Sequence, residues 1–434
     1  MMHRISMFAA MAICCCARLE AQDKATVIRG ALIYTVEGAP IDNGVLIVRN
    51  GKIVSVGPAS TSVPSDAVVV EAAGKVILPG LVDTHSHIGG GSGGDRSSAL
   101  QPDVRILDAV NPRDESFKKA LAGGITTVNV MPGSGHLMSG QTVYLKLRPA
   151  PTIEGMLFVG DPLNDIAGGM KMANGTNPIG EKPFPGTRAK SAALARALFV
   201  KAIDYKAKIE AAKGNPDKMP KRELDMEAML QVLDGRRIVH HHTHRSDDII
   251  TVLRLQKEFG FRLVLQHVTE AYLVAKEIAD AKIPCSIIVI DSPGGKQEAI
   301  HLNYENGAVL EKAGVLTGFH TDDGITDSRL FLRSAAFGVR GGMTRDGALR
   351  AVTINNAKML DLDGRVGSLK AGKDADFLIL SGDPFSVYTH VEQTWIEGKK
   401  VWDRSLPDDY KYAVGGYEVY PMEAQLDACA GGVQ

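Results

Sequence analysis

Residues 79–87 read Pro-Gly-Leu-Val-Asp-Thr-His-Ser-His and follow an apolar run at 76–78. The apolar residues predict a buried strand that ends close to the two histidines. Side chains at positions i and i+2 of a strand point to the same face, so His85 and His87 are expected side by side at the strand end. Two imidazoles placed in this way can bind one metal ion. Two ordinary core or solvent-facing histidines are the alternative.

The spacing of further candidates weakens that alternative. His242, His267 and Asp322 each come where an apolar run gives way to a loop. His267 follows His242 by 25 residues, the length of one strand–helix unit, and Asp322 follows His267 by 55, about two units. Lys171 follows His87 by 84 residues, about three units. These intervals place the candidates on strands one, four, five, six and eight of an eight-stranded barrel, at the carboxyl face where such barrels carry their active sites.

The sequence between these candidates also alternates in the way a barrel requires. Apolar runs and helical segments follow one another after residue 79, which predicts parallel strands joined by right-handed crossovers. The 71 residues from Lys171 to His242 are too many for one unit, so we expect a helical insertion with a break at 214–216. The expected strands lie at 125–130, 157–159, 238–239, 263–265, 287–290 and 315–316, and the expected helices at 190–212, 222–234, 247–259 and 270–281.

Both flanks of this region have a β pattern. Residues 25–78 alternate short β-rich runs with turns, and Asn50-Gly51 is a strong hairpin signal because its turn needs positive φ at both central residues. β-rich runs return at 376–402. We therefore expect an α/β protein with a (β/α)8 TIM-like barrel and a small β-sandwich domain built from both chain ends. The expected parts are a barrel at 79–361, sandwich parts at 22–78 and 362–410, and a C-terminal tail at 411–434.

The composition excludes several classes of function. The 49 Lys and Arg residues balance 50 Asp and Glu residues, for a formal net charge of -1. Such a chain has no strong field for a polyanion or an anionic membrane, so no nucleic-acid partner is expected. With 44% hydrophobic and 23% charged residues the composition is that of a globular protein, which excludes a disordered, collagen-like or coiled-coil chain.

The first 21 residues have the pattern of a signal peptide. A basic start is followed by an apolar run at 5–17 and by a small residue, Ala21. The run is too short to span a membrane. Ile13 before Cys14 fits a lipoprotein site poorly, so a lipid anchor is disfavoured. Cleavage would leave two cysteines, too few for a disulfide framework. We expect a periplasmic or secreted protein without membrane attachment after cleavage; a disordered N-terminus is the alternative.

The chain resembles the metal-dependent amidohydrolase superfamily and, within it, the imidazolonepropionase-like amidohydrolases, over nearly the whole length after the first 21 residues. Any single piece of the resemblance is weak, but the combination in this order is highly specific. The residues that carry it are those at 79–87, Ala122 to Val128, Gln266 to Tyr272, Thr321-Asp322, Ala351 to Ala357 and Val366 to Asp376.

The resemblance implies roles for the candidates. His85 and His87 match the first-strand ligands, His242 the fifth-strand ligand, His267 the sixth-strand ligand and Asp322 the eighth-strand aspartate. Lys171 occupies the place of a fourth-strand residue that bridges two metals, often as a lysine carboxylated by carbon dioxide. A bare ammonium cannot bind a cation, so an ordinary salt-bridging lysine is the alternative at this position.

The fifth strand leaves a question of register. His240, His242 and His244 share one face and His241 the other, so period two alone does not select the ligand. The pattern His-x-His-Arg favours His242, with His244 as the second choice. His136, His301, His320 and His390 are taken as ordinary loop or surface residues, with contact to the substrate as the alternative for His136 and His320, which lie near strand ends. Asp323 is taken as a supporting or solvated carboxylate.

The resemblance implies two divalent metal ions, with zinc favoured by the imidazole and carboxylate ligands. They would lower the pKa of a shared water from 15.7 towards about 7. Asp322 would take the proton of that water and return it to a leaving nitrogen. The expected function is therefore hydrolysis of an amide or peptide-like C–N bond. A lactonase or a deaminase using the same metal centre is the alternative.

Other classes of protein fit less well. A non-catalytic scaffold of the same architecture would lack ligands that this chain retains, and a histidine-rich storage protein would cluster its ligands instead of placing them at strand ends.

Arg245 and Tyr272 lie beside ligand positions and are candidates to bind the substrate; orientation of a histidine is the alternative. The expected partner is a small molecule such as a dipeptide, an N-acyl amino acid or a cyclic amide, and an oligomer is possible. A lid at 89–94 is weighed against a plain loop.

Overall fold

The computed structural model describes residues 24–91, 94–95, 97–162, 164–180, 184–288 and 296–415. The expected signal peptide, most of the expected tail and part of the 89–94 stretch lie outside these residues, so the predictions made for them stay predictions. Among the helices that fall within these ranges, none combines the length and the apolar character needed to cross a membrane.

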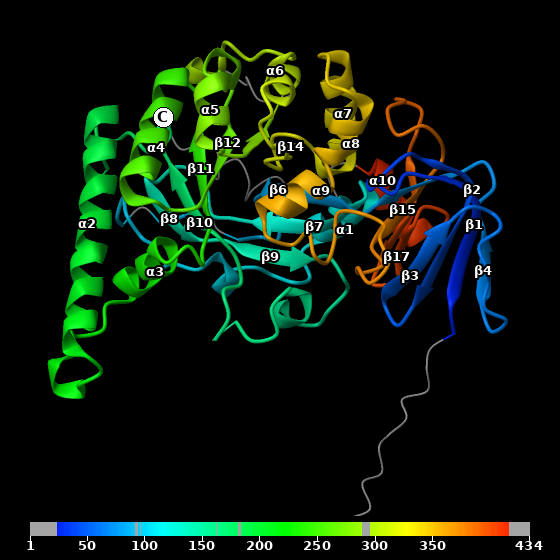
Figure 1. Ribbon diagram of the computed structural model, residues 1–434, viewed down its shortest axis with the longest axis horizontal. Helices are drawn as coiled ribbons and strands as arrows, with labels where there is room; N and C mark the ends of the chain where they lie inside the picture. Colours follow the sequence, from blue (N-terminus) through cyan, green and yellow to red (C-terminus); the bar gives the residue numbers. More distant parts are fainter. Residues whose placement is uncertain are drawn as a thin grey trace, which may run out of the picture.

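One sheet contains strands from both flanks of the chain (Figure 1). Its order is β17-β16-β15-β5-β1-β2-β3, with β4 beside β1, and β15 runs antiparallel to β5 with Phe377 opposite Pro79. The strands are β1 Thr26–Ile33, β2 Ile41–Arg49, β3 Lys52–Gly57, β4 Val68–Glu71, β5 Val76–Pro79, β15 Phe377–Leu380, β16 Val391–Ile396 and β17 Lys399–Asp403. The small β unit built from both flanks is therefore present as one connected sheet; its description as a sandwich stays a prediction.

The β2–β3 turn follows from its two residues. Asn50 and Gly51 have φ of 50° and 73°, the left-handed values that an Asn-Gly hairpin turn requires. Arg49 pairs with Lys52 across it. The hairpin predicted from the sequence is confirmed.

The α/β part is built from two further sheets. A three-stranded sheet has the order β6-β7-β9, and a six-stranded sheet the order β14-β13-β12-β11-β10-β8. Neighbours among β10 to β14 are parallel, as are β6 and β7. The strands are β6 Leu81–Ser86, β7 Ile125–Val130, β8 Met138–Gln141, β9 Val143–Lys146, β10 Met170–Ala173, β11 Val239–Thr243, β12 Leu263–His267, β13 Cys285–Ile287 and β14 Thr317–Phe319.

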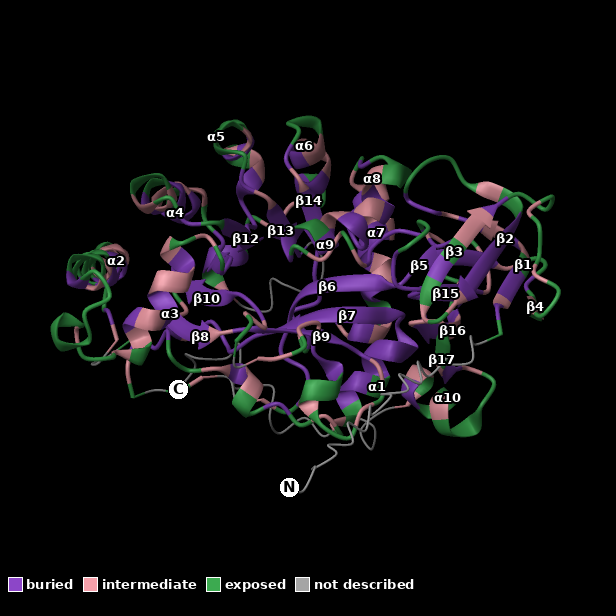
Figure 2. Ribbon diagram, turned by 60° about the horizontal axis from the view of Figure 1, so that its bottom comes forward, coloured by how far each residue is buried: buried purple, intermediate pink, exposed green. Residues whose placement is uncertain are grey.

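Helices cover the outer side of these strands. Figure 2 shows α2, α4, α5, α6 and α7 in an arc around buried strands, with their exposed faces outward. The helices are α1 Glu115–Ala122, α2 Arg188–Ala212, α3 Leu224–Leu233, α4 Ser246–Phe259, α5 Ala275–Ala281, α6 Asn306–Lys312, α7 Phe331–Arg340, α8 Arg345–Arg350, α9 Ile354–Met359 and α10 Pro407–Val414. The long insertion before β11 is confirmed as α2 and α3, and its break follows Lys213, which ends α2 with φ of 50°.

One strand prediction is wrong, and another is displaced, because 315–316 directly precede β14 at Thr317–Phe319. Residues 157–159 form no strand; Leu157 makes a single bridge to Leu145. The antiparallel segments β8 and β9, separated only by Thr142, connect the two sheets instead, because β8 pairs with β10 and β9 with β7. At the opposite edges, the Asp322 amide donates to the His85 carbonyl at 2.9 Å, which links the end of β14 to β6. Mixed α/β architecture is thus present, and the strands pair as two sheets, so their closure into one barrel stays a prediction.

A buried lysine joins the α/β part to the β-sheet unit. Lys146 at the end of β9 has no exposed side-chain surface and forms ion pairs with Asp374, Asp376 and Glu397. Its Nζ lies 3.1 Å from Asp376 Oδ2 and 3.3 Å from Glu397 Oε1. The cationic partners around Asp374 lower the pKa of that carboxyl to about 2, although burial opposes the shift.

Lys146→Met is expected to lower the free energy of unfolding by about 3–5 kcal/mol, because it replaces the cation beside the buried Asp376 carboxylate by an apolar side chain. Lys52 offers a matched control: it pairs with the same Asp374 at 2.5 Å, but its side chain is 50% exposed. Lys52→Met should therefore cost less than about 1 kcal/mol. Urea denaturation of both variants measures the two effects, and equal losses would contradict the argument.

Candidate metal centre

The six predicted ligands come from the carboxyl ends of parallel strands. His85 lies in β6 and His87 just after it, while Lys171 lies in β10, His242 in β11 and His267 at the end of β12; Asp322 follows β14. Parallel strands bring these ends to one edge. All six residues are less than 9% exposed: His85 0%, His87 6%, Lys171 0%, His242 2%, His267 2% and Asp322 7%.

Their side chains meet in one cluster. The His85 and His87 Nε2 atoms are 3.3 Å apart, and Asp322 Oδ1 lies 3.4 Å from the first and 3.0 Å from the second. Lys171 Nζ is 3.1 Å from His85 Nε2. The His267 ring centroid lies 4.7 Å from that of His85. These residues, distant in sequence, therefore surround one small volume.

The fifth strand contributes to the cluster with two histidines. The ring centroids of His242 and His244 lie 4.4 Å and 5.1 Å from that of His267. The His240 side chain contacts residues outside the cluster, since its Nε2 lies 2.9 Å from the Tyr144 hydroxyl. His241 lies on the opposite face, as period two predicts. The choice between His242 and His244 therefore remains open.

The donor atoms suit a divalent cation. Burial lowers the pKa of His85, His242, His244 and His267 well below the ordinary value, so these imidazoles are neutral and carry lone pairs. Burial is the largest single influence on Asp322 and opposes its ionisation, but hydrogen bonding with His87 together with the charges of His87, His320 and Lys171 outweighs it and holds the Asp322 pKa below its usual range. Nitrogen atoms at His85 Nδ1, His242 Nδ1 and His267 Nε2 are buried without a hydrogen-bond partner among the described residues. Neutral imidazoles with a carboxylate match the ligand preference of zinc.

Two of the candidates have an unusual backbone. His267 and Asp322 have φ of 69° and 49°, in the left-handed region that non-glycine residues seldom occupy. Each such residue costs about 1 kcal/mol or more, and in folded proteins this strain concentrates at functional sites. The backbone strain at His267 and Asp322 therefore lies at two residues whose side chains belong to the cluster.

The sequence analysis missed three residues at this site. His320, taken there as ordinary, is fully buried, and its Nε2 lies 3.0 Å from His267 Nδ1. Its position two residues before Asp322, at a strand end, was the available signal. Lys296 places its Nζ 3.3 Å from His242 Nε2 and 3.1 Å from His244 Nε2. Glu298 is 4% exposed, and its Oε1 lies 3.5 Å from the Lys296 Nζ. Neither Lys296 nor Glu298 follows an apolar run that would predict a strand.

The two proposed substrate-binding residues contact other groups. Arg245 is 44% exposed in its side chain and forms a two-bond ion pair with Asp247, both bonds 3.0 Å long. The Tyr272 hydroxyl donates to the His301 carbonyl at 3.2 Å. Asp323 is fully buried and lies 3.0 Å from Lys119 Nζ, so it is a structural carboxylate and not a solvated one. The substrate roles of Arg245 and Tyr272 stay predictions.

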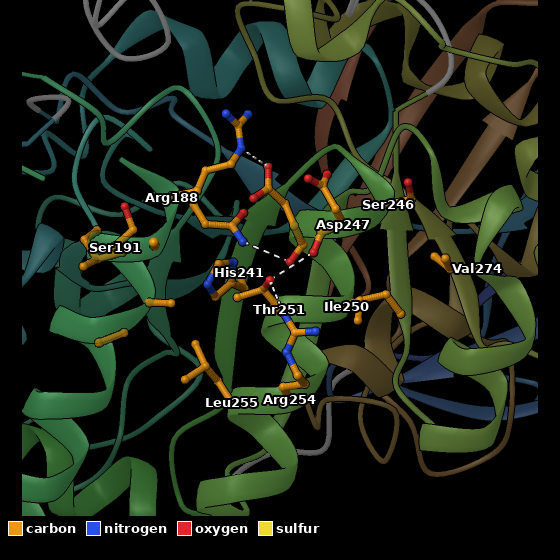
Figure 3. Close-up of a pocket in the computed structure, with 16 residues that line it drawn as sticks. Arg188, Ser191, His241, Ser246, Asp247, Ile250, Thr251, Arg254, Leu255 and Val274 are labelled. Carbon is orange, nitrogen blue, oxygen red and sulfur yellow. Dashed lines mark hydrogen bonds and ion pairs between the residues drawn. The ribbon is translucent and has the colours of Figure 1, made fainter. Parts of the chain in front are cut away.

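A cavity of about 630 Å³ lies away from the cluster, between α2 and α4 (Figure 3). Arg188, Ser191, His241 and Thr251 are among the residues that line it, and none of its lining residues is a predicted ligand. It occupies the helix-covered side of β11. The predicted ligands therefore lie outside the lining of this cavity.

The Lys296 ammonium lies where a cation bound to His242 and His244 would be. Lys296→Met should therefore raise the affinity for zinc by about tenfold, because it removes a competing positive charge at a few ångströms. Lys296→Arg keeps the charge and serves as the control. Competition against a chromophoric chelator measures both affinities, and weaker binding by the Met variant would contradict this account.

Comparison with known proteins gives a consistent set of relatives. Residues 224–402 match the model of the amidohydrolase family. The chain is 27% identical to the amidohydrolase tasK of Hapsidospora irregularis over 89% of this chain, but it spans only 44% of that protein's length. It is 22% identical to the imidazolonepropionase of Sphingopyxis alaskensis, over 79% of this chain and 88% of that one. The crystal structure of an amidohydrolase from Thermotoga maritima superposes with a TM-score of 0.82 at 35% identity, over 87% of this chain and 100% of that one.

Proposed function

Because the chain belongs to the amidohydrolase family and is therefore a hydrolase of carbon–nitrogen bonds, we propose that it cleaves an amide or peptide-like bond with water activated at a two-metal centre. The observation that carries the proposal is the convergence of His85, His87, Lys171, His267 and Asp322, with His242 and His244 beside them. We also propose that the two sheets of the α/β part together form a (β/α)8 barrel, since hydrogen bonds link their edges at Asp322 and β8 leads directly into β9.

The residues divide into two groups of donors around Lys171. His85, His87 and Asp322 would hold one ion, and His267 with His242 or His244 the other. When bound, two divalent ions would lower the pKa of a shared water and polarise the carbonyl of the substrate. Zinc fits these ligands best.

Lys171 has to change its charge to serve this centre. Addition of carbon dioxide to the neutral Nζ, with loss of one proton, converts the side chain into an anionic carbamate with two oxygen ligands. The Nζ is fully buried and 3.1 Å from His85 Nε2, so the carbamate would form beside a predicted ligand. A carbamate there would replace a positive charge by a negative one next to the cations.

In the proposed reaction, Asp322 is the group that carries the proton from the water to the leaving nitrogen. Its carboxylate is ionised and lies 3.0 Å from His87 Nε2, which fixes its orientation towards the cluster. In the proposed reaction it accepts the proton of the attacking water and then gives it to the leaving nitrogen, which would otherwise depart as an unstable anion. Burial excludes most other water from this exchange.

The proposed substrates are dipeptides, N-acyl amino acids or cyclic amides. Lactones and amidines are attacked by the same activated water, so lactonase and deaminase activities belong in the test. The signal pattern at residues 1–21 supports a further proposal, export to the periplasm or the medium. N-terminal sequencing of the exported protein tests this, and retention of residues 1–21 would contradict it.

The decisive first experiment is metal content per chain by mass spectrometry, on protein prepared with zinc and bicarbonate. About two ions per chain, with turnover of an amide in the panel, would support the proposal. One ion would argue against the bridging role of Lys171. Turnover confined to amidines or lactones would replace the amide assignment, and a metal-free, inactive protein would overturn the function.

A further inference from the structure

Four buried polar side chains form a continuous chain of contacts beneath the metal centre. Thr84 Oγ1 lies 2.6 Å from Ser286 Oγ, which lies 2.9 Å from His320 Nδ1. His320 Nε2 lies 3.0 Å from His267 Nδ1. Thr84, Ser286 and His320 are fully buried and His267 is 2% exposed. The chain crosses β6, β13, the end of β14 and β12, and it ends on a predicted ligand.

The direction of these hydrogen bonds determines which nitrogen of His267 is free. A neutral imidazole carries one N–H, so only one of its two ring nitrogens can donate. If His320 donated to His267 Nδ1, the proton of His267 would sit on Nε2. That atom is buried and has no hydrogen-bond partner within the described ranges, so an N–H there would be left unsatisfied.

The opposite direction places no N–H on that unpartnered nitrogen. His267 Nδ1–H then donates to His320 Nε2, His320 Nδ1–H to Ser286 Oγ, and Ser286 Oγ–H to Thr84 Oγ1. The lone pair of His267 is thereby placed on Nε2, the unpartnered nitrogen. Metal-binding histidines generally donate their second ring N–H to a fixed acceptor, which sets both tautomer and ring orientation.

His320 also contacts a second predicted ligand. Its ring stacks on that of His85, with centroids 4.9 Å apart and an interplanar angle of 22°. One side chain therefore contacts ligands from strands β6 and β12. Displacement of this ring would disturb both.

We propose that His320, held by Ser286 and Thr84, is a positioning residue that fixes His267 as an Nε2 metal ligand. The inference rests on the proposed metal-dependent function and deepens it, because it gives His320, which could with His85 and His267 also hold an ion directly, a role that acts through His267. His320 acts through His267, so its loss should be seen first in metal binding.

The test compares two substitutions of similar size. His320→Gln keeps an acceptor for the His267 N–H and a donor for Ser286, whereas His320→Met keeps neither. His320→Met is expected to weaken zinc binding by about 10–100-fold, with His320→Gln close to the wild type. Ser286→Ala should show an intermediate loss. Chelator competition gives the zinc affinities, and the visible spectrum of the cobalt-substituted proteins reports the ligand set.

Thermal unfolding of the metal-free proteins controls for packing, with His390→Met, a substitution of a 43% exposed histidine, as a surface control. Equal zinc affinity in the wild type and His320→Met would overturn the inference. A loss of zinc affinity that merely parallels a loss of stability in the metal-free protein would also overturn it. Equal losses in the Gln and Met variants would also overturn it, because they would make His320 a direct ligand. A wild type that binds no zinc would overturn the proposed function itself, and that outcome is separate from the others.

Discussion

Asp322→Asn is expected to reduce kcat by about 10²–10⁴-fold on the best amide of the panel, because the variant loses the group that transfers the proton. The asparagine has nearly the same size and keeps one carbonyl oxygen toward His87 Nε2, 3.0 Å away in the parent protein. The fold should therefore change little. Steady-state kinetics with metal content measured on the same sample gives the result per metal-loaded chain.

The neighbouring aspartate shows why metal content has to be measured. Asp323 accepts hydrogen bonds from Lys119 Nζ at 3.1 Å and from the Ser328 amide at 2.9 Å, within the core. Asp323→Asn should therefore mainly lower stability, since it leaves Lys119 buried beside a neutral group. If Asp322→Asn kept full kcat with full metal, the proton-transfer role would be wrong. If it lost activity only in proportion to metal, its role would be that of a ligand.

The positions of the candidate ligands at strand ends could be predicted because their placement follows from periodicity. An apolar run ends at 82, and His85 and His87 come at a spacing of two, which puts both on one face of β6. The intervals to His242 and His267 then measure strand–helix units. The helical insertion followed in the same way from an interval too long for one unit.

Other features depend on tertiary contacts that a pattern does not contain. His267 and Asp322 have positive φ, and although Asp and His adopt this region more often than most other residues, no sequence pattern indicates which of them do so. Lys296 reaches the centre from a connection with no periodicity. Arg245, placed beside a ligand in sequence, instead pairs with Asp247 two residues on, because a local ion pair was available.

The chain also shows that burial does not by itself identify a functional lysine. Lys119, Lys146 and Lys171 are among the largest fully buried side chains. Lys119 and Lys146 place their ammonium groups against carboxylates, as structural lysines do. Lys171 lies 3.1 Å from an imidazole nitrogen of His85 and 3.1 Å from the Met131 sulfur. The surroundings of Lys171 therefore resemble those of a metal ligand. A change in the charge of its side chain is expected to affect metal binding more than the same change at Lys119 or Lys146.

Lys171→Ala is therefore expected to reduce the metal content from about two ions per chain to about one, because the bridging carbamate can no longer form. The loss of activity should exceed the 10–100-fold that removal of an outer partner typically causes, on the order of 10² or more. Metal analysis and kinetics on one sample measure both. Full occupancy by two ions in the variant would contradict a bridging role.

Small carboxylates provide a sharper test of the same idea. Lys171→Ala leaves a buried space beside His85 that acetate can enter, and two carboxylate oxygens can there replace those of the carbamate. Added acetate should then restore the second ion and part of the activity. Lys171→Met fills the same space with a side chain of similar length and should not respond. If acetate restored the second ion and activity in both variants, acetate would not be acting at this position. The same would hold if acetate restored them in neither variant and zinc remained at one ion per chain. In that case the loss in Lys171→Ala would reflect packing around His85 and not a missing anionic bridge.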